Sequence, residues 1–260
     1  MDRERLLAHL TSEDERLLGA RTLDWAQRSL RDGKPTVTPF FDPAQRELVH
    51  GLLGSVDGVG WRNYGGYPKA ERQRIVIYPD YFLTELIEIP VRAVEVTGEF
   101  PTPPSHRDVL GAVVGLGITR EQVGDILPRA NGAQLIVASE LLDFIVASWE
   151  RIGRVAVRAQ EIDLERLDVE PERVKEIRTT VASMRLDALA AAGYGTSRTR
   201  MAREIRMERV KVNWKPVTNP AAEVKEGDVL SIRGRGRVVI QELKGTTRKG
   251  RISVVLQRYM

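Results

Sequence analysis

The sequence predicts an α+β protein built from more than one domain. Its 260 residues exceed the usual size of a single compact domain. Strand-like and helix-like segments alternate in the middle of the chain, and the last third is basic whereas the rest is acidic. These observations predict an N-terminal α/β unit at 1–90, a central α/β sandwich at 91–165, a linker at 166–182 and a basic module at 183–260.

Composition excludes several classes of protein. With 42% hydrophobic and 29% charged residues, the chain is expected to fold rather than stay disordered. The absence of cysteine excludes disulfide scaffolds, thiolate zinc sites and cysteine nucleophiles, and it fits a reducing compartment. The first residues are charged where a secretory signal is apolar, and no segment is long and uncharged enough to span a bilayer. We therefore expect a cytoplasmic protein without a membrane partner.

The N-terminal unit begins with helical patterns. Leucines recur at helical spacing through residues 2–31, which predicts two helices. Asp42 followed by Pro43 predicts the start of a third helix, because aspartate caps exposed N–H groups and proline suits the first helical position. Residues 75–78 read as a strand, and Gly65-Gly66 reads as a turn or a flexible tip.

The central unit alternates strands and helices. The expected order is strand 91–97, helix 105–116, a loop with a short helical turn, strand 132–138, helix 140–152 and strand 154–161. This order predicts a ferredoxin-like or RNA-recognition-motif-like sandwich. The aromatic residues that an RNA-recognition motif uses to stack bases are missing from "RAVEVTG" and "GAQLIVA". We therefore expect no base stacking on this sheet.

The last third of the chain concentrates positive charge. Residues 183–260 contain 17 Lys and Arg against 7 Asp and Glu, whereas the remainder contains 23 against 29. A basic face on one module is the electrostatic signature of a protein that binds a phosphate backbone. The sequence therefore indicates an RNA-binding module at the C-terminal end.

A basic helix is the centre of this module. Ser197 is a candidate N-cap for "RTRMAREIRM". Helical spacing predicts one buried arc, formed by Met201, Ala202 and Ile205, and one outward arc, formed by Arg200, Arg203 and Arg206. The outward arginines either form a solvated surface or bind phosphate. Three like charges at i+3 spacing repel one another unless an anion binds to them, and this favours phosphate binding.

The strands that follow carry further cations. In "VKVN" the valines are expected to be buried, with Lys211 and Asn213 pointing outward. Trp214 either stacks on a base or packs on its own domain, and packing is the commoner outcome at the edge of a small sheet. Further cations are expected to follow a sugar-phosphate strand or to lie in the next hairpin turn: Arg233, Arg235, Arg237, Lys244, Arg248, Lys249 and Arg251.

The same stretch resembles a known RNA-binding domain. "RLDALAAAGYGTSRTRMAREIRMERVKVN", followed by "KEGDVLSI", resembles the S4 domain, a helix pair with a small sheet. The resemblance implies RNA contacts at six positions: Arg185, Ser197, Arg198, Arg203, Lys211 and Asn213. One position departs from the pattern, because Glu208 stands where S4 domains usually have glycine. A positive φ there would cost glutamate about 1 kcal/mol.

A wider resemblance covers nearly the whole chain. "FFDPAQRELV", "GGYPKAERQRIVIYPDYF", "HRDVLGAVVGLGITREQVGDIL" and "VNWKPV" resemble the bacterial YlmH-type S4 proteins, whose cyanobacterial and plastid relatives carry a photosystem II label. The resemblance implies a ribosome-associated RNA-binding protein that engages the large subunit carrying an obstructed peptidyl-tRNA. It also implies that, in some bacteria, such a protein supports C-terminal tailing of the stalled nascent chain during ribosome quality control.

Enzymatic motifs are absent or incomplete. His106-Arg107-Asp108 imitates a kinase loop, but position 113 is valine rather than asparagine, so we interpret it as a helix start capped by Ser105. "GAVVGLGI" lacks the dinucleotide glycine spacing, and the three histidines have no metal-ligand spacing. The clusters that remain for catalysis are Asp125 and the "GGYPKAERQR" loop. Within that loop, Lys69, Arg72 and Arg74 either make a second RNA or protein contact or are solvated.

The sequence thus predicts a non-enzymatic RNA-binding protein without cofactor or metal, monomeric when free. Its expected partners are rRNA or tRNA and the large ribosomal subunit. The alternative is an S4-guided RNA-modifying enzyme, of the pseudouridine synthase or methyltransferase type. The predicted RNA-binding residues are Arg185, Ser197, Arg198, Arg200, Arg203, Arg206, Lys211, Asn213, Lys215, Arg233, Arg235 and Arg237.

Overall fold

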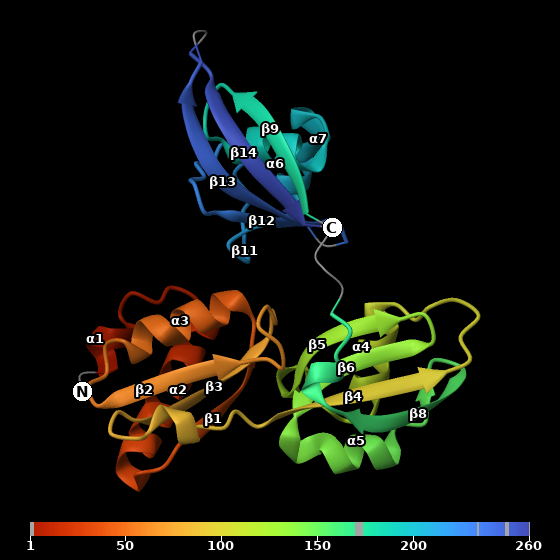
Figure 1. The fold of residues 1–260 in the computed structure, drawn as a ribbon. Helices are drawn as coiled ribbons and strands as arrows, with labels where there is room; N and C mark the ends of the chain where they lie inside the picture. The colour runs from red at the N-terminus through yellow and green to blue at the C-terminus, as the bar shows by residue number, and fades with distance from the viewer. Residues whose placement is uncertain (1–2, 170–173, 233, 248–249, 260) are drawn as a thin grey trace. The chain divides into compact units, whose positions relative to one another are not determined.

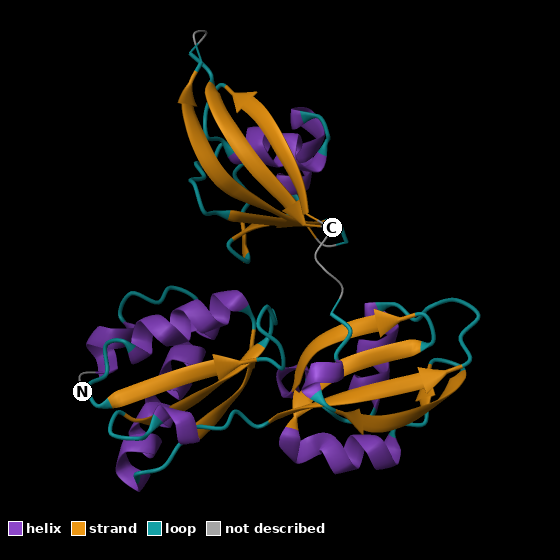
Figure 2. Ribbon diagram, in the orientation of Figure 1, coloured by secondary structure: helices purple, strands orange, loops and turns teal. Residues whose placement is uncertain are grey.

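The computed structural model describes residues 3–169, 174–232, 234–247 and 250–259. The chain divides into two compact units, 1–169 and 170–260, each of which is described by itself (Figure 1). Both mix helices and strands, as Figure 2 shows, so the predicted multi-domain α+β class is confirmed. Within the described ranges, no helix is long and apolar enough to cross a membrane.

The first unit begins with a three-stranded antiparallel sheet and its helices. The elements are α1 (Arg3–Leu7), α2 (Glu13–Asp32), β1 (Thr36–Phe41), α3 (Pro43–Leu53), β2 (Val59–Tyr64) and β3 (Gln73–Pro79). The strand order is β1-β3-β2, and every residue of the central strand β3 is buried. Asp42 caps α3 through a capping box with Gln45, so the predicted helix start and the two preceding helices are confirmed.

The strands β1 and β2 were missed by the sequence analysis. β1 contains Pro39, a residue that argues against a strand assignment because proline cannot donate to the ladder. In the structure, β1 is an edge strand, and its register shifts between Val37 and Phe40. The proline therefore lies at an irregularity of an edge, where its missing N–H breaks no central pairing.

The second half of this unit is a five-stranded antiparallel sheet with the order β5-β6-β4-β8-β7. Its elements are η1 (Thr84–Leu86), β4 (Val91–Gly98), α4 (His106–Gly115), η2 (Arg120–Gln122), β5 (Val123–Arg129), β6 (Gly132–Ala138), η3 (Ser139–Leu141), α5 (Leu142–Ser148), β7 (Arg151–Ile152), β8 (Val155–Ile162) and η4 (Leu164–Arg166). Leaving aside the short β7, the order is that of a ferredoxin-like βαββαβ unit, as predicted.

Two elements of this half differ from the prediction. The sequence predicted a loop with a short helical turn directly before β6. The structure has a 3₁₀ turn, η2, and then a seven-residue strand, β5, that was not predicted. The expected helix 140–152 is a 3₁₀ turn followed by α5, and it ends before β7. Short apolar runs do not distinguish a strand from a helix by their sequence pattern. Residues 123–129 form a strand because they pair with β6.

The glycine-rich loop is packed rather than mobile at its tip. Gly65 and Gly66 are buried, and a Cβ on Gly65 would lie 2.2 Å from the carbonyl oxygen of Arg72. The Asp125 carboxylate accepts hydrogen bonds from the backbone N–H groups of Glu71 (2.7 Å) and Arg72 (2.9 Å) and from the Tyr67 hydroxyl (2.7 Å). Asp125 and this loop, which we considered for catalysis, thus anchor the first sheet to β5.

Arg72 and Arg74 do not form an outward contact surface, so that prediction is wrong for both. Arg72 donates to the carbonyl oxygens of Phe40, Arg120 and Val123. Arg74 is only 6% exposed. The partners of Arg72 and Arg74 lie far away in the sequence, so no local pattern indicated that these arginines are engaged. Lys69, in contrast, is exposed.

Arg74 connects the two sheets of this unit through a bidentate ion pair. Its Nη1 and Nη2 each donate to one oxygen of Glu140 at 2.9 Å. The remaining donors bind backbone carbonyls, Nε to Thr38 and Nη1 to Pro90. Four of the five N–H groups of the buried guanidinium are thereby engaged, and the carboxylate supplies the countercharge, which makes its burial tolerable.

The sheet face that an RNA-recognition motif uses for bases is covered in this protein. Ile136 and Ala138 of β6 are buried beneath a cluster that includes Tyr64, Tyr67 and Leu164. Farther along, Gln134 donates to Glu95 and accepts from the backbone N–H of Asp168. The packing agrees with our expectation that bases do not stack on this sheet.

The second unit is a six-stranded antiparallel sheet with two helices on one face (Figures 1 and 2). Its elements are β9 (Val174–Val181), α6 (Leu186–Tyr194), α7 (Arg198–Arg206), β10 (Val210–Val212), β11 (Lys215–Pro216), β12 (Val229–Ile232), β13 (Gly236–Thr246) and β14 (Ile252–Tyr259). The predicted linker 166–182 is wrong over its second half. Residues 174–181 form β9, which pairs along its whole length with β14.

We expect Glu140→Gln to lower the stability of the first unit by about 1–3 kcal/mol, because it leaves the buried Arg74 without its countercharge. Unfolding by urea measures the change. The control is Glu161→Gln: Glu161 pairs with Arg92 at 3.6 Å while both side chains are about half exposed, so its loss should cost less than about 1 kcal/mol. Equal losses in both variants would contradict the role given to the Arg74–Glu140 pair.

Candidate nucleic-acid interface

The helix pair of the second unit presents one face to its sheet and one to solvent. Leu186 and Leu189 of α6, with Met201 and Ile205 of α7, are fully buried in a single core. Ser197 begins α7, and its hydroxyl accepts the backbone N–H of Arg200 at 3.2 Å. The predicted cap and the burial of Met201 and Ile205 are confirmed, whereas Ala202 of the predicted arc is half-buried.

The opposite face of α7 is cationic. Arg200, Arg203 and Arg206 are exposed. Among the residues that the structure describes, no side-chain hydrogen bond or ion pair engages these three guanidiniums. Their repulsion within two turns of helix is therefore not relieved by the surrounding protein, which leaves the face suited to a polyanion.

A buried carboxylate fixes two more arginines beside this helix. Asp187, in the first turn of α6, has an 8% exposed side chain. It accepts from Arg185 Nε at 3.2 Å and Nη2 at 3.1 Å, and from Arg198 Nη2 at 3.0 Å to both oxygens. Burial alone would raise the pKa of Asp187, but the hydrogen bonds from Arg185 and Arg198 outweigh it and hold the pKa below its usual value.

These two arginines remain accessible despite the shared carboxylate. Their side chains are 42% and 55% exposed. One negative charge balances two positive ones, so the cluster keeps a net positive charge. The sequence analysis singled out Arg185 and Arg198 but missed Asp187, which is only visible as their partner once α6 and α7 are placed together.

The end of α7 has the geometry anticipated from the S4 resemblance. The N–H of Arg209 donates to the carbonyl of Glu204 at 3.1 Å, and that of Glu208 donates to Ile205 at 2.9 Å. This is a Schellman-type ending, whose turning residue adopts a left-handed conformation. Glu208 holds that position with φ of 57°, so glutamate carries the strain that glycine would avoid.

Asn213 is engaged in structure instead of pointing outward unbound. Its Nδ2 donates to Asp228 Oδ1, and its Oδ1 accepts the N–H of Val229, both at 2.9 Å. The side chain therefore joins the β10–β11 hairpin to the start of β12. A role in RNA contact remains a prediction for this residue, and the structural role accounts for its bonds.

The arginines after β12 take different positions. The guanidinium of Arg235 lies 5.2 Å from the ring centre of Tyr194, and Arg237 lies 4.7 Å from that of Tyr259. Arg258 covers the Tyr194 ring as well, at 5.4 Å. Burial raises the pKa of Tyr194 to about 12, although the two arginines oppose that shift. Arg233 lies outside the described residues.

Strand register separates the predicted cations into two groups. Val210 and Val238 face the helix-covered core, so their neighbours Lys211 and Arg237 face the other side of the sheet. The pairing continues that row from Lys211 through Ser231, Arg237 and Tyr259. The predicted set is thus not one continuous surface: the α7 arginines lie on the helix face, and Lys211 and Arg237 lie on the other face of the sheet.

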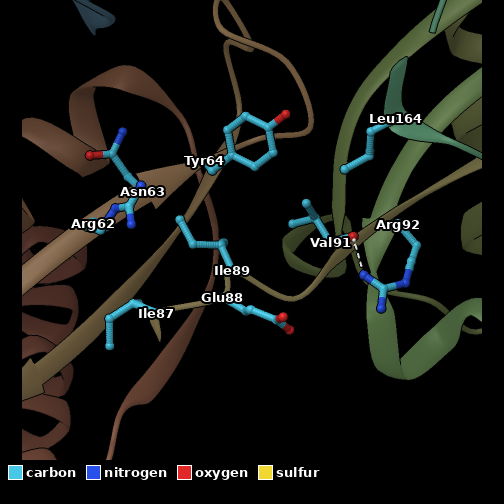
Figure 3. Close-up of a pocket in the computed structure, with 9 residues that line it drawn as sticks. All are labelled: Arg62, Asn63, Tyr64, Ile87, Glu88, Ile89, Val91, Arg92 and Leu164. Carbon is cyan, nitrogen blue, oxygen red and sulfur yellow. Dashed lines mark hydrogen bonds between the residues drawn. The ribbon is translucent and has the colours of Figure 1, made fainter. Parts of the chain in front are cut away.

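The first unit contains a separate cleft of about 420 Å³ (Figure 3). It is lined by Arg62, Asn63, Tyr64, Ile87, Glu88, Ile89, Val91, Arg92 and Leu164. Its guanidiniums are engaged by the protein: Arg62 donates to the Thr84 carbonyl at 2.7 Å, and Arg92 donates to the Val91 carbonyl at 3.1 Å. The cleft therefore lacks the freely presented cations of the helix face.

The histidines show packing and surface positions. His50 lies beside Trp61, with ring centres 5.9 Å apart. Burial lowers the pKa of His50, and the nearby positive charge of Arg46 lowers it further. Ser105 caps α4 together with Asp108, so the kinase-like tripeptide is a helix start, as interpreted. Over the described ranges, no group of three His, Asp or Glu residues is arranged to hold a metal.

Family comparisons cover nearly all of the chain. Residues 15–82 match the N-terminal domain of YlmH, residues 85–166 match a domain described as "Putative RNA-binding domain in YlmH", and residues 184–230 match the S4 domain. A Bacillus subtilis protein named ribosome-associated protein quality control protein P2 is 34% identical over 247 residues, covering 95% of this chain and 96% of the relative. The chain belongs to the YlmH family.

Two further relatives match parts of this YlmH-family protein. The small ribosomal subunit protein uS4 of Desulfotalea psychrophila is 37% identical over 70 residues, covering 25% of this chain and 33% of the relative. A solved structure, the cell division protein YlmH of Streptococcus pneumoniae, is 28% identical with a TM-score of 0.52. The match covers 61% of this chain and 97% of the chain in the solved structure.

We expect Asp187→Asn to destabilise the second unit by about 2 kcal/mol at neutral pH, because hydrogen bonds to a charged group are lost. The folded pKa of Asp187 is lowered, so its contribution is present above the unfolded pKa of about 3.9 and is lost as pH falls through the folded pKa. Urea unfolding of both proteins across acidic pH measures this. A difference that grows on acidification would contradict the assignment.

We expect Glu208→Gly to raise the stability of the second unit by about 0.5–1 kcal/mol, because glycine adopts the left-handed conformation without a Cβ penalty. Thermal unfolding measures the gain. The neighbouring Met207 has a φ of −89°, so Met207→Gly serves as the control and should bring no gain. Stabilisation by both substitutions, or by neither, would count against strain at Glu208.

Proposed function

We propose that this YlmH-family protein binds RNA of the large ribosomal subunit, or the peptidyl-tRNA held there, through the exposed face of α7. The role would be ribosome-associated quality control of stalled nascent chains. The observations that carry the proposal are the row of exposed arginines, Arg200, Arg203 and Arg206, and the Arg185–Asp187–Arg198 cluster in the same helix pair.

The chemistry of this face supports a phosphate backbone as the ligand. Guanidinium groups form charge-assisted, often bidentate hydrogen bonds with phosphate oxygens. Asp187 holds Arg185 and Arg198 in place, so fewer side-chain rotations are lost when an anion binds. The arginines of α7 supply additional contacts at one-turn spacing along the same helix.

The distribution of charge supports binding through one end of the chain. The positive excess of residues 183–260 contrasts with the negative balance of the remainder. A polyanion is attracted by the first and repelled by the second, which orients the encounter. The comparisons support the ribosome as the target, since the Bacillus subtilis relative is named as ribosome-associated and the other is a ribosomal protein.

We expect Arg200→Ala combined with Arg203→Ala to weaken binding to large ribosomal subunits and to reduce its salt dependence. Each lost phosphate contact removes about one released counterion, so the slope of log affinity against log salt should fall by about 1–2. Sedimentation of protein with purified subunits over a salt series measures both effects.

The matched control is Arg178→Ala combined with Arg251→Ala, which removes the same charge from the same unit. Arg178 pairs with Glu176, and Arg251 donates to the side chain of Thr180, so neither belongs to the α7 face. This control should retain the salt slope of the parent. A parental slope in the α7 variant would refute the proposed interface.

A further inference from the structure

Trp214 is packed differently from the other tryptophans of this protein. Trp25 and Trp61 pack against the core of the first sheet, and Trp149 is 3% exposed with its indole N–H bound to the Arg151 carbonyl. Trp214 is half-buried and belongs to none of the core clusters. In the part of the chain that the structure describes, it has no hydrogen-bond or ring partner.

The backbone at Trp214 is strained. Asn213 and Trp214 form the two-residue turn between β10 and β11, with φ of 49° and 64°. Such turns require positive φ at both positions and favour Asn-Gly, so tryptophan at the second position costs about 1 kcal/mol. Strain of this kind persists where the surrounding structure enforces it, and it is concentrated at functional sites.

The turn is held rigidly from one side. Asn213 bonds to Asp228 and Val229, and Asp228 is itself 6% exposed and accepts the N–H of Lys225 at 2.8 Å. The indole is therefore mounted on an anchored turn rather than on a mobile loop. A ligand that stacks on the indole therefore binds without the entropy loss of ordering this turn.

Two lysines lie on the strands of the hairpin that carries Trp214. Lys211 and Lys215 are exposed and lie on the two paired strands that lead into and out of the turn. A partly exposed aromatic ring on a hairpin that also carries lysines matches a nucleotide, because a base can stack on the ring while the phosphates of the strand interact with the cations. A protein partner with an apolar patch would gain nothing from these lysines.

We propose that Trp214 stacks on an unpaired base of the RNA that the second unit binds. The inference rests on the proposed function and deepens it, since the arginine face reads only the backbone. Stacking requires a base that is not enclosed in a duplex, so Trp214 adds a preference for an unpaired nucleotide near the hairpin.

The experiment uses the full chain and protein-free large-subunit rRNA as the probe. Trp214→Ala should lower affinity about tenfold, the size of one lost stacking contact, and Trp214→Phe should restore part of it. Trp214→Gly is the decisive variant: relief of strain should raise the melting temperature while affinity falls as in Trp214→Ala. Leu243→Ala, which removes another exposed apolar side chain from the same unit, should leave affinity unchanged.

Three results would overturn the proposal. Parental rRNA affinity in Trp214→Gly would show that the indole does not stack on RNA. Loss of binding to intact subunits but not to protein-free rRNA would assign Trp214 to a ribosomal protein instead. Failure of the parent chain to bind protein-free rRNA would overturn the stacking proposal together with the rRNA part of the proposed function, and would leave the peptidyl-tRNA as its target.

Discussion

The Asp187 carboxylate determines how the candidate interface is built. It lies at the start of α6 and binds an arginine from just before that helix and another from the first turn of α7. Without it, two guanidiniums in close proximity would repel and sample many rotamers. With it, they are held together at the cost of one charge. The buried carboxylate thus supports exposed positive charge, and Arg200, Arg203 and Arg206 add further exposed positive charge on α7.

A comparable device stabilises the first unit, although it serves packing rather than binding. The buried guanidinium of Arg74 connects β3 with Glu140, and Asp125 binds the backbone of the glycine-rich loop. Both charges are fully used by the fold, so neither is available to a ligand. In the second unit, by contrast, the buried carboxylate holds two arginines that remain exposed.

Local signals in the sequence were sufficient for much of the fold. Helix starts at Asp42, Ser105 and Ser197 were predicted because each cap acts on N–H groups three residues away. The S4 pattern likewise singled out Glu208 as the position where a positive φ would be costly, and the structure has a positive φ there. What could not be predicted depended on distant partners. Arg74 and Glu140 are 66 residues apart, and the division of Lys211 and Arg237 from the helix face followed only from strand register.

The pairing of β9 with β14 has a consequence for how the protein is made. β9 precedes both helices in the chain, yet its ladder partner is the strand at residues 252–259, which also pairs with β13. During synthesis, β9 emerges with an unpaired edge and keeps it until that partner has been translated. The segments of α6 and α7 are therefore synthesised before the sheet beneath them can close, and the unit reaches its final form only after translation of the β14 segment is complete.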